Sequence, residues 1–514
     1  MLVDRRTFVK TMAAAGLVLP LGSFSALGQS STKSIRAGVT AYPWPFVPAK
    51  RGTGAAATYF AQSLLHIQLL QYDLSGSLIG ILAESWELEN ETTWVFKLRD
   101  VKFSDGTPII ADDVRWSIEF AGRTESALPE ATAFAQLKTE VVDDKTIKIV
   151  TDRPNPSVPH LMAHQYFFIL HRDSDTEADR VLGAGPFVLE SYERGVNAVF
   201  VRNPNYYRPG YPLADRFEVI AYLDENLRAS ALLAGDVDII EFVPWGAAAS
   251  VAATPGMAIE QQGEGSLLTL AMNGQGPLGN VHLRKAVANA IRRQEIVDTV
   301  FFGNGAPMNG TPRMRGSAYY WAEHDNFYRN DPDLVRSLLQ EGGAAEGLEL
   351  TLGAAGELGF YRESAVLIQN HLQDYGIKVN LQLTDLPTMQ ENQRRGAGDM
   401  FIGGGGATTL DPMIVTRGRL DPSGPSVLGR SLNFTVDGLA ALIEQAERET
   451  NEEKRRQLVY DIDQLVLDNG AFCGLVYRPT IFGRRQELEG FRLWPWMLSI
   501  LSLCLSDEMR LNTW

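Results

Sequence analysis

The sequence is poor in cysteine: its 514 residues include only Cys473 and Cys504. Two thiolates are too few to hold an iron–sulfur cluster. In an oxidising compartment the pair could form one disulfide, or both could be small apolar side chains. The sequence leaves the two alternatives open, because it does not give the distance between the two residues.

Long apolar runs are also missing. The one sustained run, Ala13 to Leu21, is too short to span a bilayer. Apolar residues make up 45% and charged residues 21%, as in soluble globular proteins, and the length predicts two or three domains. The net charge of −15 argues against nucleic acid or an anionic membrane surface as a partner. We therefore expect neither nucleic-acid binding nor direct membrane insertion.

The motifs of common enzyme classes are absent. There is no G-x-S-x-G elbow, no H-E-x-x-H and no cofactor fingerprint. His160 and His164 have the spacing of a metal pair on one helix face, with His171 further on. Prolines directly precede the pair and no cysteine or carboxylate accompanies it, which favours surface or packing histidines. We expect no enzyme activity, no cofactor and no metal.

The amino terminus resembles a Tat-type secretory signal. Arg5 and Arg6 precede the short apolar run, and small residues at 26–28 form a cleavage signal. Residues 1–28 are thus predicted to be removed, leaving a mature chain that begins near Gln29. The alternative is a signal anchor that stays attached. Since no cysteine near the cleavage point offers a lipid anchor, the sequence predicts a free protein in the periplasm.

The most regular part of the sequence alternates strand and helix patterns. Apolar periodicity predicts three strands separated by two helices, the pattern of a parallel sheet with crossover helices. Elsewhere we expect a strand at 93–98, a helix capped by Asp112, and one continuous helix over 281–302. The predicted α/β unit comprises strands 348–352, 377–383 and 399–402 and helices 361–375 and 387–395.

Four consecutive glycines, Gly403 to Gly406, directly follow the third strand of this unit. Ligands of open α/β sheets bind outside the carboxyl ends of the strands. A glycine there lets a ligand or a facing lobe approach the backbone. A phosphate loop is disfavoured because no lysine follows and Asp411-Pro412 opposes an immediate helix. The glycine run is therefore predicted to line a binding cleft.

Aromatic residues near turns are further candidates. Tyr42 and Trp44 follow the first mature strand, Trp245 follows another, and Trp494 and Trp496 lie near the carboxyl end. Exposed tryptophans stack on flat ligands, although core packing is the commoner role of each one taken alone.

Several segments together resemble the extracellular solute-binding proteins of family 5, which serve peptide-, nickel- and opine-type ABC transporters. The matching segments follow in the family's order over nearly the whole mature chain, and their combination is specific. They are "LAESWEL…TWVFKLRDVKFSDGTPIIADDVRWSIE" (82–119), "GAGPFVLESYERGVNAVFVRNPNYY" (183–207), "LLAGDVDII" (232–240) and "VHLRKAVANAIRRQEIVDTVFFGNGAPMNG" (281–310).

The resemblance implies an α/β periplasmic binding protein of the type II-like, class C kind. Two lobes joined by a hinge close on the ligand, and an extra α/β subdomain sits on lobe I. The strands ending at Met272-Asn273 and spanning Leu475 to Tyr477 would cross between the lobes. The implied division is lobe I at 32–56, 184–272 and 480–514, the extra subdomain at 57–183 and lobe II at 273–479.

The resemblance also raises a discrepancy at the glycine run. Peptide-binding members commonly carry a tryptophan here and, three residues later, an aspartate that pairs with the ligand's amino group. This chain has Gly405 and Thr408 instead. A buried ammonium without a carboxylate partner is costly. We therefore expect a larger ligand, or one without the usual amino terminus. Asp411 could substitute for the missing carboxylate.

Other groups near the run suggest the ligand's chemistry. The hydroxyls of Thr408 and Thr409 suit sugars or opine conjugates, and Arg417 and Arg419 could meet an anion. Solvated loop arginines are the commoner alternative. The predicted ligand-binding residues are Tyr42, Trp44, Trp245, Asn273, Phe360, Gly405, Thr408, Thr409, Asp411, Arg417 and Tyr477.

The function expected from the resemblance is capture of a small organic solute and its delivery to an inner-membrane ABC permease, by a protein expected to be monomeric. A peptide, an oligosaccharide or an opine-like solute fits; nickel fits less well. The alternative is an exported enzyme or a chaperone on the same scaffold.

Overall fold

The computed structural model describes residues 33–48, 55–124, 126, 128, 130–173, 181–406, 409–424, 428–493 and 506–513. The predicted signal peptide, Thr408, Trp494, Trp496 and Cys504 lie outside these residues. Within them, no helix has both the length and the apolar character needed to cross a membrane.

One large sheet runs through the described residues. Eleven strands join it, in the order β15-β14-β16-β12-β17-β11-β1-β10-β9-β8, with β13 paired to β17. The strands are β1 (Ser34–Val39), β8 (Phe187–Glu193), β9 (Asn197–Arg202), β10 (Arg216–Ala221), β11 (Ile239–Ile240), β12 (Met257–Met272), β13 (Ala306–Pro307), β14 (Leu348–Ala355), β15 (Ile377–Thr384), β16 (Met400–Gly406) and β17 (Gly474–Arg485).

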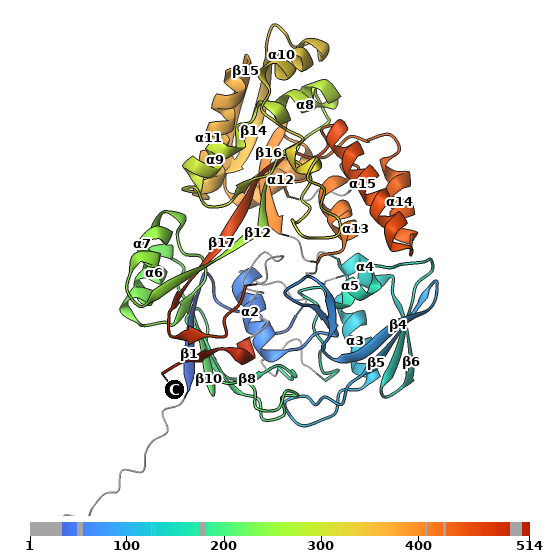
Figure 1. Ribbon diagram of the computed structural model, residues 1–514, viewed down its shortest axis with the longest axis vertical. Helices are drawn as coiled ribbons and strands as arrows, with labels where there is room; N and C mark the ends of the chain where they lie inside the picture. The colour runs from blue at the N-terminus through green and yellow to red at the C-terminus, as the bar shows by residue number, and fades with distance from the viewer. Residues whose placement is uncertain are drawn as a thin grey trace, which may run out of the picture. The chain divides into compact units, whose positions relative to one another are not determined.

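The two longest strands, β12 and β17, connect the two ends of this sheet. They pair with each other antiparallel from Met257 to Thr269 (Figure 1). At one end β17 pairs with β11, which leads to β1 and β10. At the other end β12 pairs with β16, which leads to β14 and β15. Both strands predicted to cross thus belong to one continuous ribbon.

The predicted strand–helix–strand–helix–strand unit is confirmed. β14 pairs parallel with both β15 and β16, and helices α11 (Gly359–Gln373) and α12 (Leu386–Arg395) make the crossovers. The core here contains fully buried Leu352, Ile368 and Ile402. The apolar periodicity of the sequence thus reflects real burial.

The glycine run lies inside a strand, which corrects its predicted place beyond the strand's end. β16 continues through Gly406 because its backbone pairs antiparallel with β12 from Ser266 to Met272. The sequence did not reveal this, since glycine has low strand propensity and the partner strand lies over 130 residues away.

Two helix predictions were wrong in detail. The helix expected over 281–302 is two helices, α8 (Val281–Ala290) and α9 (Arg293–Val300), because Ile291 is extended. The buried Arg293 guanidinium donates to the carbonyls of Ala288 and Ile291, which satisfies the groups freed at the break. The helix near 112 is α3 (Ala111–Ala121), and its N-cap is Ile110 rather than Asp112.

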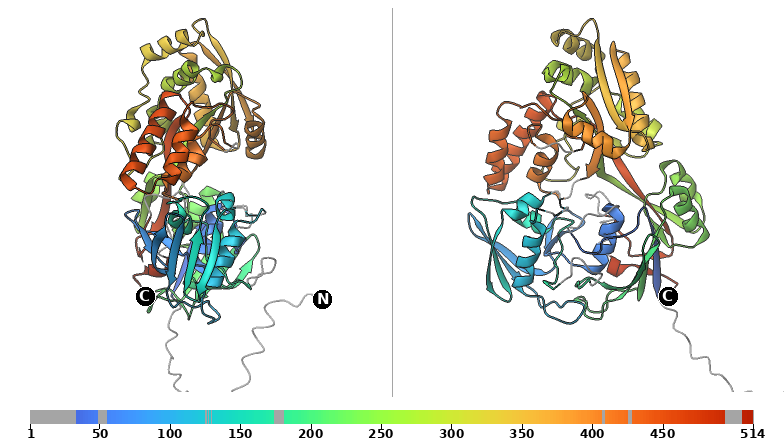
Figure 2. Two further views of the ribbon diagram at one scale, coloured as in Figure 1. Left: turned by 90° about the vertical axis from the view of Figure 1, so that its right-hand side faces the viewer. Right: turned by 180° about the vertical axis from the view of Figure 1, so that it is seen from behind.

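A second sheet, of order β4-β5-β7-β6, has its own core. Its strands are β4 (Ala83–Asn90), β5 (Thr93–Leu98, as predicted), β6 (Lys138–Asp143) and β7 (Thr146–Val150), joined by α3, α4 (Ala131–Ala135) and α5 (Val158–Met162). Helices α14 (Leu439–Arg448) and α15 (Glu452–Asp468) lie side by side (Figure 2). The other elements are α2 (Ala55–Leu65), α6 (Glu225–Ala234), α7 (Ala248–Ala253), α10 (Pro332–Glu341), α13 (Pro412–Val415), the pairs β2 (Leu70–Tyr72) with β3 (Leu78–Gly80) and β18 (Leu488–Glu489) with β19 (Arg510–Leu511), and the short helical turns 245–247, 277–279, 324–326, 416–420 and 506–508.

Candidate functional site

Three of the glycines in β16 make room for specific neighbours. A Cβ on Gly403 would lie 2.4 Å from the backbone of Gly429, and one on Gly404 would lie 3.2 Å from the hydroxyl of Tyr361. A Cβ on Gly405 would lie 2.3 Å from Nη2 of Arg419, and its φ of +149° disfavours other residues. The space that the sequence assigned to a ligand over Gly405 is occupied by a guanidinium.

Arg419 reaches Gly405 from a π-helical turn, Thr416–Leu420. Its Nη1 donates to the carbonyl of Leu428 at 2.9 Å. Burial lowers the pKa of the Arg419 guanidinium, and the charges of Tyr361, Glu130 and Tyr166 oppose this lowering. The side chain nevertheless keeps some solvent-accessible surface.

A second arginine lies nearby on β17. Nε and Nη2 of Arg478 donate to the hydroxyl of Ser266 at 3.0 and 2.8 Å. Its guanidinium lies over the ring of Phe360, 4.7 Å from the centroid. Like Arg419, it keeps partial exposure while burial lowers its pKa.

Aromatic rings complete this group. Phe360, at the start of α11, makes edge contacts with Trp245 at 5.6 Å and with Tyr361 at 4.6 Å. Burial raises the pKa of Tyr361, and the charges of Arg478 and Arg419 oppose the rise, so the phenol lies near both guanidinium groups. We call Trp245, Phe360, Tyr361, Arg419 and Arg478, with Gly404 and Gly405, the arginine–aromatic cluster.

Thr409 and Asp411 belong to a different group. Asp411 is fully buried, and its Oδ2 accepts from Arg455 and from Ser157, each at 2.9 Å. Thr409 bonds the hydroxyl of Tyr72 at 2.8 Å. We call these five residues the Asp411 network.

The carboxylate of Asp411 is therefore already paired. Its Oδ1 also caps α13 by accepting from the backbone N–H groups of Met413 and Ile414. Burial alone would raise the pKa of Asp411, but the charges of Arg455 and His160 and these hydrogen bonds hold it well below its ordinary value. The idea that Asp411 replaces the missing carboxylate for a ligand ammonium conflicts with this arrangement.

His160 and His164 do not converge on a metal position. Nδ1 of His160 lies 2.6 Å from the hydroxyl of Tyr72, whereas Nε2 of His164 lies 2.6 Å from Glu130. α5 ends at Met162, so the two histidines are not on one helix. Within the described residues, no group of three or more potential ligands could hold a metal ion.

Three more predicted residues have structural partners. Nδ2 of Asn273 donates to the carbonyls of Gly396 and Gly398. The Tyr477 ring is buried, and its hydroxyl donates toward the carbonyl of Thr311 at 3.3 Å. Arg417 is exposed and ion-paired with Glu447 at 2.8 Å. These roles stabilise the fold, and the bonds of Asn273 leave its amide little freedom for a ligand.

Tyr42 and Trp44 lie on the loop after β1. The guanidinium of Arg194 lies 5.1 Å from the centre of the Trp44 ring, which also packs against the core around β1. The structure thus brings together Trp245, Phe360 and Gly405, and it places Thr409 and Asp411 together in a different network.

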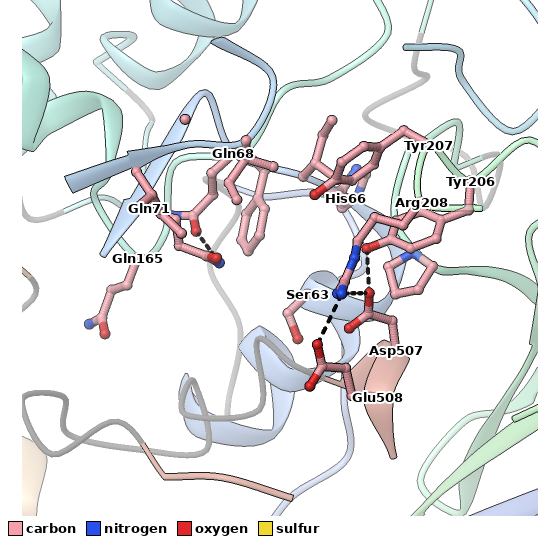
Figure 3. A pocket seen from close by; sticks show the side chains of 16 residues that line it. Ser63, His66, Gln68, Gln71, Gln165, Tyr206, Tyr207, Arg208, Asp507 and Glu508 are labelled. Atoms are coloured by element: carbon pink, nitrogen blue, oxygen red, sulfur yellow. Dashed lines mark hydrogen bonds and ion pairs between the residues drawn. The ribbon is translucent and has the colours of Figure 1, made fainter. Parts of the chain in front are cut away.

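A cavity of about 350 Å³ lies elsewhere (Figure 3). Arg208 is held there by Asp507 and Glu508 at 2.5 and 2.9 Å, and Gln68 and Gln71 bond each other on the opposite side. Its one guanidinium is therefore already paired with two carboxylates of the same cavity. Its lining comes only from residues 63–81, 165–208 and 507–508, and it includes none of the predicted residues.

Arg478 and Tyr361 were missed by the sequence reasoning. A signal existed for Arg478, because a lone arginine interrupts the apolar strand from Leu475 to Phe482, and a buried charge needs a reason. Tyr361 carried no such signal, since tyrosine is common at the start of buried helices.

Comparison with known proteins identifies the class. The fold matches two-lobed periplasmic binding proteins. AgaA, solved in complex with agropinic acid from A. tumefacien R10, has a TM-score of 0.80 and 25% identity, covering 93% of this chain and 98% of that one. DppA from Helicobacter pylori, in complex with the peptide STSA, has a TM-score of 0.77 and 18% identity, covering 93% and 98%.

Curated sequences agree. The probable D,D-dipeptide-binding periplasmic protein DdpA of Escherichia coli is 24% identical over 85% of this chain and 87% of its own. The glutathione-binding protein GsiB of Salmonella paratyphi A is 23% identical over 95% and 96%. Residues 77–425 match the model of bacterial extracellular solute-binding proteins, family 5 (middle region).

The chain belongs to the bacterial extracellular solute-binding proteins of family 5. It is accordingly a solute-binding protein of the kind that serves ABC importers, and the expectation of a binding protein rather than an enzyme is confirmed by this membership.

Proposed function

We propose that this protein captures a small organic solute, a peptide-like, oligosaccharide or opine-like compound, between two lobes, and that the arginine–aromatic cluster forms part of the binding site. The single observation that carries the proposal is the position of this cluster. Arg478 lies on β17, one of the two strands that link the ends of the large sheet, and Gly405 on β16 pairs with the other linking strand, β12. A ligand held there would contact the elements about which the lobes move.

The proposed lobes follow the predicted division, with lobe I at 32–56, 184–272 and 480–514, the extra subdomain at 57–183 and lobe II at 273–479. In this division the Asp411 network joins two parts of the molecule. Tyr72 and Ser157 come from the extra subdomain, whereas Thr409, Asp411 and Arg455 come from lobe II. Bonds of this kind would form on closure and stabilise the closed state.

The cavity of Figure 3 supports the ligand site less well. All of its lining residues come from lobe I and the extra subdomain, so a ligand there would not bridge the lobes. Bridging is what couples binding to closure, because a ligand shifts a conformational equilibrium only through contacts that differ between the two states.

The cellular setting is part of the proposal. Twin arginines at 5 and 6 support export by a Tat-type route, followed by removal of residues 1–28. DdpA is described as periplasmic, which supports the same compartment. There the protein would act as a monomer and deliver its solute to an inner-membrane ABC permease.

Mass spectrometry of the solute that co-purifies with the protein tests this function. The protein would be made in a native-like host, denatured to release the solute, and refolded for titration with the identified compound. We expect one solute per chain, recovered unchanged, and a smaller radius of gyration in solution scattering when it is bound. A compound that is converted during incubation would indicate an enzyme, and broad weak binding without compaction would indicate a chaperone.

A further inference from the structure

The charge of the arginine–aromatic cluster is not balanced at Arg478. In the described part of the chain, its guanidinium has hydrogen bonds only to Ser266, an aromatic contact with Phe360, and no ion pair. A guanidinium carries more N–H donors than these bonds use. Keeping such a group partly desolvated without a carboxylate is costly, so the arrangement favours an anionic partner.

Tyr361 provides an independent observation. The side chain is only 6% exposed, yet its hydroxyl makes no hydrogen bond to a described residue. The hydroxyl oxygen is not among the fully buried atoms that lack a partner, so it keeps contact with solvent. The hydroxyl lies over Gly404, where the missing Cβ leaves it space, and both guanidinium groups lie near it. It is therefore placed to donate to the same acceptor as the arginines.

The surroundings add positive charge. Arg430 is 2% exposed, and its Nε and Nη2 have no partner among the residues that the structure describes. Burial lowers the pKa of Arg430; Asp421 opposes this lowering, whereas the nearby charge of Arg419 adds to it. The charge of Glu130 opposes the lowering of the pKa of Arg419, but the Glu130 carboxylate also contacts Nε2 of His164. A ligand ammonium beside Arg478 would thus meet repulsion.

We infer that the solute carries an oxyanion, a carboxylate or a phosphoryl group, bound by Arg478, Tyr361 and Arg419. An apolar or planar part of the same solute lies along Phe360 and Trp245. This inference rests on the proposed function and narrows it, because a neutral oligosaccharide, or a solute whose only charge is an ammonium, does not fit the cluster.

The test compares charged and neutral probes. Wild-type protein freed of its solute would be titrated calorimetrically with agropinic acid, glutathione, a sugar phosphate and neutral oligosaccharides. Agropinic acid and glutathione carry carboxylates and the sugar phosphate carries a phosphoryl group, so the acid that binds identifies which oxyanion the site recognises. We expect at least one acid to bind and the neutral sugars to fail. Binding of the neutral sugars alone would overturn the inference and leave the proposed function standing. Failure of both the acids and the neutral sugars to bind would contradict the inference and the proposed function together.

Variants locate the oxyanion. Arg478→Gln should weaken binding of the acid roughly 10- to 100-fold and Tyr361→Phe roughly 10-fold, the loss expected for hydrogen bonds to a charged group. Arg336→Gln is the matched control, because this exposed arginine on α10 is paired with Asp333 and belongs to no candidate site, and affinity should stay within about twofold.

Folding is checked separately. Circular dichroism and ligand-free melting of each variant should match the wild type, and Arg478→Lys provides a second substitution that keeps the charge. If correctly folded Arg478→Gln and Tyr361→Phe both bind the acid with wild-type affinity, the inference is wrong.

Discussion

Glu241 is a buried carboxyl group whose contribution to the stability of the protein depends on pH. It is 2% exposed and accepts from the backbone N–H and the hydroxyl of Thr40 at 3.1 and 3.2 Å. Burial raises the pKa of Glu241 to about 7, against the lowering effect of Thr40 and Arg228. Its contribution to stability is therefore complete below its unfolded pKa and is lost as the pH rises through 7.

Glu241→Gln should remove this loss. Near pH 8 we expect the variant to be more stable by up to about 3 kcal/mol, and near pH 5, where Glu241 is already protonated in the folded protein, by little. Urea unfolding at both pH values measures the difference. An equal change in the free energy of unfolding at both values would contradict the assignment.

Gly403 tests packing at the same scale. Its absent Cβ would lie 2.4 Å from the backbone of Gly429, which cannot rotate away as a side chain can. Gly403→Ala should therefore destabilise the protein by roughly 1–3 kcal/mol. Gly418→Ala is the control, because nothing lies within 4 Å of that position and φ is not positive. Similar melting temperatures for the two variants would show that Gly429 moves aside.

At the scale of elements, the Asp411 network anchors the segment that follows β16. Asp411→Asn keeps a good N-cap for α13 but leaves Arg455 buried without its carboxylate. Loss of one partner of a buried ion pair typically costs about 3–5 kcal/mol, and Ser157→Ala, which removes one neutral donor, should cost about 1–2. Chemical denaturation measures both changes.

The same network predicts an acid response. Since the pKa of Asp411 is held below its ordinary value, its stabilising effect is present above the unfolded pKa and lost as the pH falls through the folded one. On acidification, the free energy of unfolding should fall further for the wild type than for the Asp411→Asn variant. Parallel pH profiles of stability for the two proteins would mean that other carboxylates determine the response to acid.

At the scale of the whole molecule, export is open to a direct test. Replacing Arg5 and Arg6 with lysines should leave the unprocessed protein in the cytoplasm, because a Tat-type signal depends on the arginine pair. Cell fractionation and the mass of the exported chain measure this outcome. Unchanged export with cleavage near residue 28 would indicate the general secretory route instead.

Much of the architecture was accessible from local sequence patterns. The parallel unit from Leu348 to Ile402 was predicted because each strand and helix shows its own apolar period, which depends on neighbouring residues alone. The family was recognisable for a related reason, since its blocks follow in a fixed order along the chain. The continuous helix predicted over 281–302 failed because a buried side chain, Arg293, satisfies the carbonyls at an unmarked break.

The site was predicted only in part. The sequence by itself determined that a glycine-rich strand end, Trp245 and Phe360 were candidates, because unusual composition and aromatic residues near turns are visible locally. Only the tertiary structure decided that Arg419 occupies the space over Gly405, that Asp411 belongs to Arg455 and Ser157, and that Arg478 has no carboxylate among the described residues. Asp411 and Ser157 are 254 positions apart in the chain, and which side chain neutralises which charge depends on contacts of this kind.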